Sequence, residues 1–130
     1  METRHGLFDP LKIGSMEIKN RVAFAPTGMN TPGPDGSVSD QTICHYTARA
    51  MGGAGLVIVE HSLCTRRHWK AALPMLSFHS GDFLPEMKDL SDAIHHYGAK
   101  AVVQLSLGMG RQTSLRVTGD ELVAPSPVPY

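Results

Sequence analysis

Three polar side chains stand where short apolar segments of this chain end, and their types suit acid–base or hydrogen-bonding chemistry. Glu60 and His61 follow the apolar run Leu56–Val59, and Gln104 follows the run Ala101–Val103. A histidine in such a place can serve as a general base, as a metal ligand or as a ring packed on a cofactor. Taken alone, a histidine at a strand end is more often a structural residue.

A metal site is not expected among these residues, although Cys64 lies close to them in the sequence. Neighbouring side chains on a strand alternate between its two faces, so Glu60 and His61 should point apart. No second pair of ligands accompanies them. On its own face, Glu60 could be neutralised by a partner such as Arg21, a pairing that the sequence permits.

Gln104 carries the more specific chemistry, because a carboxamide both donates and accepts hydrogen bonds. The pyrimidine edge of a flavin presents an N–H group flanked by carbonyl oxygens, and one carboxamide can match a donor–acceptor pair on that edge. A glutamine bonded to neighbouring backbone is the more common arrangement. Spacing alone leaves both interpretations open.

The elements that must position these residues begin with a hairpin and a short strand. Leu11–Ile18 fits a hairpin whose Gly14-Ser15 pair suits a type II′ turn. Val22–Ala25 is typical of a buried parallel strand, which Pro26 ends because proline cannot donate to the ladder. The next segment, 27–37, is rich in glycine and proline and is therefore expected to be a loop.

Two helices and two further strands follow in alternation. Ser39 or Asp40 can cap the first helix, which Gly52-Gly53 ends; its expected apolar face is Ile43, Tyr46, Thr47, Ala50 and Met51. A second strand covers Gly55–Glu60, and a long loop is expected over residues 62–81. Asp82 is the expected cap of the second helix, and Gly98 closes it; its apolar stripe is Phe83, Met87, Leu90, Ile94 and Tyr97. The third strand covers Lys100–Ser106, and residues 107–130 are loop-like.

This alternation of strands and helices indicates parallel βαβ units and an α/β fold. The formal net charge is +0 and no basic block occurs, which argues against nucleic acid or anionic membranes as partners. No apolar run approaches the roughly 20 residues of a membrane helix, and no secretory signal opens the chain. We therefore expect a cytoplasmic protein in which Cys44 and Cys64 are buried, reduced thiols.

Several stretches resemble the Old Yellow Enzyme family, in particular its 2,4-dienoyl-CoA reductase and 2-enoate reductase branch. They occur in the order expected for that family and cover nearly the whole chain. The stretches are Leu7–Gly14 with Ile18–Val22, Ala25–Met29, Gly53–Glu60, His95–Lys100, Val103–Ser106 and Val123–Pro127.

The resemblance implies that residues 1–130 are the N-terminal part of a flavin-binding (β/α)8 TIM barrel, with a hairpin and about three βα units. The chain would then be incomplete on its own, with the rest of the barrel as its partner, since such barrels need about 250 residues. The implied activity is an FMN-dependent ene-reductase that passes hydride from NAD(P)H through FMN to an activated C=C bond of a small-molecule substrate. The implied flavin contacts are Ala25, Pro26, Thr27, Gly28, His61 and Gln104.

The sequence also departs from the family pattern. His61 stands where members usually have a small residue, and the segment Leu107–Arg111 lacks a histidine found after the glutamine strand in many members. The proton-donating tyrosine, the substrate-anchoring residues and the phosphate loops of the family lie on later strands. No catalytic residue is therefore expected in this chain, and the fragment by itself should be inactive.

Two alternatives remain open at the level of sequence. One is an amine dehydrogenase of the trimethylamine dehydrogenase type, whose longer members add an iron–sulfur cluster and FAD beyond this region. The other is a truncated or split partner half that binds no cofactor alone. A barrel fragment unrelated to flavin would leave the strand that ends in Gln104 unexplained.

Overall fold

The computed structural model describes residues 6–65 and 74–106. Its first element is a hairpin in which β1 (Leu11–Ile13) pairs antiparallel with β2 (Met16–Ile18). Gly14 has a φ of 60°, whereas Ser15 has no positive φ, which is the combination of a type II′ turn. The expected hairpin is therefore confirmed.

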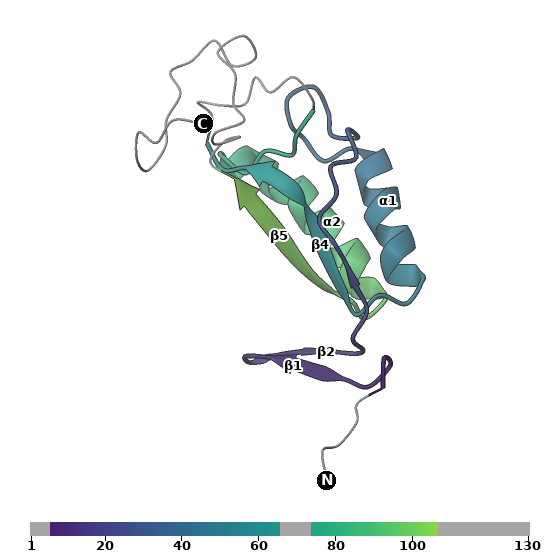
Figure 1. Cartoon of the computed structure of the whole chain (residues 1–130). Coiled ribbons are helices and arrows are strands. Elements are labelled where there is room, and N and C mark those ends of the chain that lie inside the picture. The colour runs from purple at the N-terminus through teal and green to yellow at the C-terminus, as the bar shows by residue number, and fades with distance from the viewer. Residues whose placement is uncertain (1–5, 66–73, 107–130) are drawn as a thin grey trace, which may run out of the picture.

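A parallel sheet of three strands follows, in the order β3-β4-β5. Its strands are β3 (Ala23–Phe24), β4 (Leu56–Leu63) and β5 (Lys100–Ser106). Helix α1 (Asp40–Met51) connects β3 to β4, and α2 (Leu84–His96) connects β4 to β5. The predicted βαβ order is thus present, and Figure 1 shows both helices covering the same face of the sheet.

The helix ends follow local capping chemistry. Ser39 caps α1, and its hydroxyl accepts a hydrogen bond from the backbone N–H of Thr42. Ser80, and not Asp82 as the sequence suggested, is the capping residue ahead of α2; it accepts from the N–H of Asp82 and opens a short 3-10 helix, Gly81–Phe83. Gly98 ends the α2 segment with a φ of 70°.

The core lies between the two helices and the sheet. Tyr46 of α1 and Ile94 of α2 are fully buried there against Val57 of β4. Two residues that were expected in the core are exposed: Met51, the last residue of α1, is 64% exposed, and Tyr97, which follows the last residue of α2, is 38% exposed.

Two further expectations need correction. β4 does not end at Glu60 but continues to Leu63, which bridges to Ser77, so part of the predicted loop 62–81 extends the sheet. Both cysteines are free as expected, but Cys44 is exposed and Cys64 is only partly buried. Residues 66–73 of the expected loop 62–81 and the expected loop-like segment 107–130 lie outside the described residues.

Within the described part of the chain, no helix is long and apolar enough to cross a membrane.

Candidate functional site

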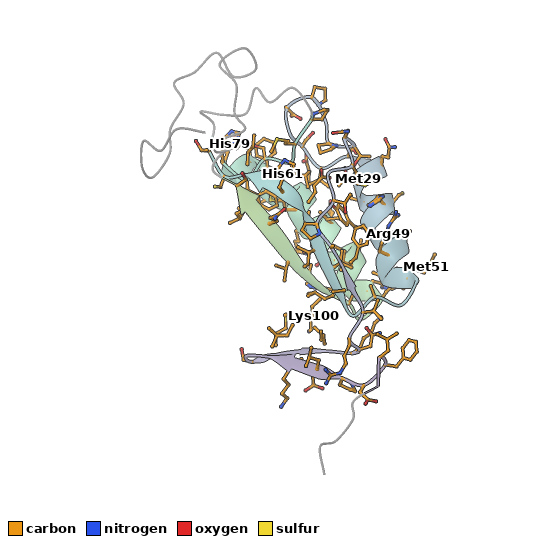
Figure 2. All side chains as sticks on the ribbon, viewed as in Figure 1. Met29, Arg49, Met51, His61, His79 and Lys100 are labelled. Carbon is orange, nitrogen blue, oxygen red and sulfur yellow. The ribbon has the colours of Figure 1, made fainter. Side chains whose placement is uncertain are left out.

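The polar residues singled out in the sequence meet at the end of the sheet where the parallel strands run out. Val59 pairs with Val103 and Ser62 pairs with Leu105, so Gln104 lies opposite Glu60 and His61. Figure 2 shows His61 and Met29 at this end of the sheet and Lys100 at the opposite end. Carboxyl ends of parallel strands are where α/β barrels place their function.

A β-bulge interrupts β4 at this point. Three residue steps separate Val59 from Ser62, whereas two separate their partners on β5, so β4 carries one extra residue. A bulge re-aims the side chains next to it. Glu60 accepts a hydrogen bond from Tyr46 of α1, so its side chain points to the face of the sheet that the helices cover.

The surroundings of Gly28 show that the side chains of Glu60 and His61 both approach the turn after β3. A methyl group added to Gly28 would stand 3.6 Å from Cε1 of His61 and 3.7 Å from Oε2 of Glu60. The turn after β3 therefore packs directly on the bulge of β4. A larger side chain at position 28 would fill the space between the turn and the imidazole.

Glu60 is buried at this junction, with 1% of its surface exposed. One carboxyl oxygen accepts from the N–H of Met29 at 3.1 Å, and the other accepts from the hydroxyl of Tyr46 at 3.5 Å. Burial raises the pKa of Glu60, while the Met29 N–H, the nearby His61 and the Tyr46 hydroxyl oppose that rise. This carboxyl is thus held by hydrogen bonds in an environment that disfavours its charge.

Arg21 is not the partner of Glu60, contrary to expectation. Ala23 pairs with Leu56 at the start of the sheet, so Arg21 lies near the amino ends of the strands. Glu60 lies four residues beyond Leu56, toward the opposite end. The partner that the sequence did not reveal is Tyr46, whose place on the apolar face of α1 suggested only a core role.

Gln104 projects from the face of β5 that the helices leave uncovered. Ala101 and Val103 pack toward the core, so by alternation Val102 and Gln104 point the other way, and both are exposed. Ala25, Thr27 and Gly28 are exposed as well, whereas Pro26 and His61 are half-buried.

These residues fit a flavin in the kind of contact they offer. The exposed carboxamide of Gln104 presents a donor and an acceptor together, as a pyrimidine edge requires. Gly28 has no side chain to block the approach of a planar ring to the turn after β3. The six expected contact residues therefore come from two strand ends and one turn at the same end of the sheet.

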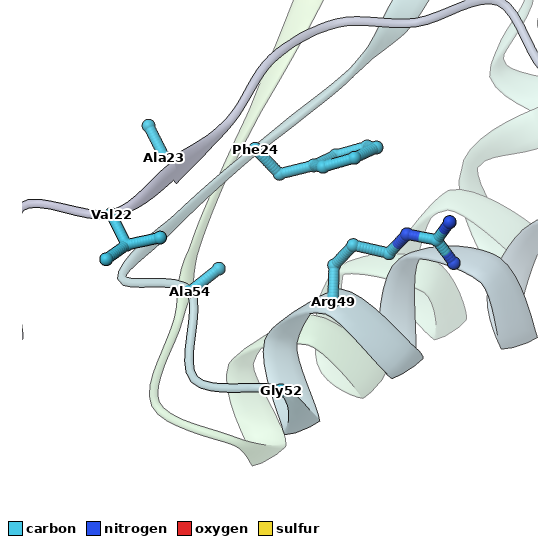
Figure 3. A pocket seen from close by; sticks show the side chains of 6 residues that line it. All are labelled: Val22, Ala23, Phe24, Arg49, Gly52 and Ala54. Atoms are coloured by element: carbon cyan, nitrogen blue, oxygen red, sulfur yellow. The ribbon is translucent and has the colours of Figure 1, made fainter.

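Other parts of the described chain offer weaker sites. No group of three or more metal-binding side chains gathers among the described residues. A hollow of about 280 Å³ lies between β3 and α1, where the guanidinium of Arg49 stacks 5.4 Å from the ring centroid of Phe24 (Figure 3). It is lined by Val22, Gly52 and Ala54 near the amino ends of the strands, away from Gly28 and Gln104.

Comparison with known proteins assigns the family. Residues 6–128 match the NADH:flavin oxidoreductase / NADH oxidase family. The chain belongs to this family. Among curated relatives, it is 37% identical to cinnamate reductase of Clostridium sporogenes and 39% identical to NADH oxidase of Thermoanaerobacter brockii, in each case over 95% of this chain and 19% of the relative.

Solved structures place the fold within the same family. An Old Yellow Enzyme homologue from Zymomonas mobilis superposes with a TM-score of 0.81 and 28% identity, over 94% of this chain and 33% of that protein. Morphinone reductase superposes with a TM-score of 0.82 and 28% identity, over 95% of this chain and 32% of that enzyme. The chain thus has the fold of the N-terminal part of an Old Yellow Enzyme barrel and spans about a fifth to a third of the proteins it matches.

Proposed function

We propose that this chain supplies the flavin-contacting N-terminal part of an FMN-dependent ene-reductase. The complete enzyme would use NADH or NADPH as reductant and act on a small molecule with an activated C=C bond. Family membership supports a flavin and a nicotinamide reductant, and the names of the relatives, cinnamate reductase and morphinone reductase, support reduction of an unsaturated substrate. The rest of the barrel, as a further segment or a partner chain, would complete the site.

The observation that carries this proposal is the position of Gln104. Its exposed carboxamide lies opposite the Glu60–His61 bulge, on the sheet face that the helices leave open. We propose that it bonds the pyrimidine edge of the flavin, while the turn Ala25–Gly28 borders the ring and His61 packs beside it. The bound flavin supplies hydride transfer, and the residues of this chain hold and orient it.

The substitution Gln104→Leu tests this assignment, because it keeps the volume roughly constant and removes both polar groups. A buried group of the flavin left without its partner costs about 1–3 kcal/mol, so FMN affinity should fall by about one to two orders of magnitude. The measurement is FMN titration of the chain combined with the remainder of its barrel. Gln41→Leu is the matched control, since Gln41 is exposed on α1 and is not among the expected flavin contacts.

The chain alone should not retain FMN tightly, because its described residues form three parallel strands of a barrel that needs eight. Gel filtration followed by a flavin absorbance spectrum checks this. A chain that elutes with one bound FMN per molecule would contradict the need for the rest of the barrel. Unchanged FMN affinity and reduction rate in Gln104→Leu would instead show that Gln104 is purely structural.

A further inference from the structure

We propose that Glu60 is a positioning residue that, together with Tyr46, holds the turn at Gly28 and Met29 against His61. This proposal rests on the proposed function, because the turn and His61 are the parts of the chain assigned to the flavin. Its basis is the set of hydrogen bonds that joins Glu60 at the bulge of β4 to Tyr46 on one side and to Met29 on the other.

The bulge creates the need for this arrangement. A bulged residue loses its regular ladder bond, and a buried N–H without a partner is costly. The N–H of Glu60 donates instead to the hydroxyl of Tyr46 at 2.8 Å, and the same hydroxyl donates to the carboxyl group of Glu60. Burial raises the pKa of Tyr46 to about 12, so its hydroxyl stays protonated and remains a donor. One phenol therefore satisfies both the backbone and the side chain of the bulged residue.

The other carboxyl oxygen of Glu60 reaches the turn after β3. It accepts the N–H of Met29, a residue of a loop that has no regular backbone pairing at that point. Asn30, the next residue, has a φ of 57°, a left-handed conformation that asparagine adopts more readily than most residues. The bond from Met29 to Glu60 ties this turn to β4 beside His61, where a methyl group added to Gly28 would stand 3.6 Å from the imidazole.

A purely structural role would not require a carboxyl group here. Burial of an ionisable side chain is unfavourable, and an apolar residue of similar volume generally serves stability as well or better. Glu60 is instead kept 1% exposed with its oxygens directed at Tyr46 and at the backbone of Met29. Its acceptor oxygens set the position of the turn, which an apolar residue could not do.

Glu86 of α2 offers a matched comparison, because it bonds the same loop. Its carboxylate accepts the N–H of Val38 at 3.0 Å, so it also ties the loop between β3 and α1 to a neighbouring element. That bond lies nine residues after Met29, at the far end of the loop. Loss of Glu86 should therefore loosen the loop locally without moving the turn at Gly28.

Hydrogen exchange of the Met29 amide tests whether Glu60 holds the turn, and it is measured on the full chain without flavin. Glu60→Leu keeps the bulk but removes the acceptor, so exchange at Met29 should accelerate at least about tenfold relative to the wild type. Glu60→Gln retains an acceptor oxygen and should stay within about threefold. Glu86→Leu should leave Met29 unchanged. Glu60→Met provides the same comparison if Glu60→Leu does not fold, and unchanged exchange in a folded variant would overturn the proposal.

The effect of the turn on flavin binding is measured by titrating FMN into the chain combined with the rest of its barrel. Glu60→Leu should weaken FMN binding about tenfold and change the visible circular dichroism of the bound flavin, whereas Glu60→Gln should restore both. Altered Met29 exchange with an unchanged flavin signal would overturn the positioning role. If the wild-type protein binds no FMN at all, the proposed function fails, while the exchange result still decides how Glu60 acts on the turn.

Discussion

The hydroxyl group of Tyr46 gives the sharpest test of how the bulge of β4 is stabilised. Tyr46→Phe removes one oxygen atom from a side chain with 0% exposure and leaves its ring in place. That ring packs edge-on to Phe24 and His45, and these contacts should persist. The change therefore isolates the polar contribution of the hydroxyl.

The expected loss follows from the two bonds that the hydroxyl makes. The N–H of Glu60 loses an acceptor at 2.8 Å, and a buried donor without a partner costs about 1–3 kcal/mol. The bond to the carboxyl group is long, at 3.5 Å, so its removal adds little. We expect the free energy of unfolding to fall by about 2–3 kcal/mol, which corresponds to roughly 8–12 °C in the melting temperature for a domain of this size.

Thermal and urea denaturation, followed by far-ultraviolet circular dichroism, measure this loss. Tyr97→Phe is the control, because Tyr97 is 38% exposed and lies at the other end of the molecule; exposed substitutions usually change stability by less than about 0.5 kcal/mol. Equal stabilities of Tyr46→Phe and Tyr97→Phe would refute the reasoning, since the bulge would then not depend on the phenol for its hydrogen bonds.

Three further outcomes are expected. Gly36→Ala should cost about 2–4 kcal/mol in urea denaturation, because Gly36 has a φ of 87° and a methyl group would stand 2.6 Å from Cβ of Ser77; Gly81→Ala, with no atom nearer than 3.8 Å, should be nearly neutral. Burial raises the pKa of Glu60 above its ordinary 4.5. The folded state therefore binds a proton before the unfolded state does, and the wild type should gain stability over Glu60→Gln as the pH falls through the raised pKa toward 4.5. Parallel pH profiles of the unfolding free energy for the wild type and Glu60→Gln would contradict this raised pKa. His61→Ala should leave turnover of the complete enzyme within about tenfold, whereas a loss of about 10²–10⁴-fold that His61→Gln does not restore would identify His61 as an acid or base.

Local chemistry explains the parts of the fold that could be read from the sequence. The Gly14-Ser15 turn, the cap at Ser39 and the end of a helix at Gly98 depend on residues within a few positions of each other. The strand Lys100–Ser106 was predicted with its observed bounds, because its apolar run is short and begins directly after a helix end. Gln104 could be singled out for the same reason, since it stands near the end of that run.

Neighbouring residues do not predict the exposure of Met51 and Tyr97, nor do they predict the length of β4. Helical spacing shows which residues share a face but not where the neighbouring sheet ends, so terminal turns were counted as buried. β4 extends to Leu63 because Ser77 arrives from a later segment to pair with it.

By itself, the sequence determined the order of the elements and the strand ends at which polar residues gather, because both follow from hydrophobic period and turn chemistry. Only the tertiary structure decided how those residues face one another. The bulge at Glu60 arises from unequal spacing along two paired strands, and its hydrogen bonds reach 14 residues back to Tyr46 and 31 residues back to Met29. Such contacts depend on the packing of a helix and a loop against the sheet, and no local pattern encodes them.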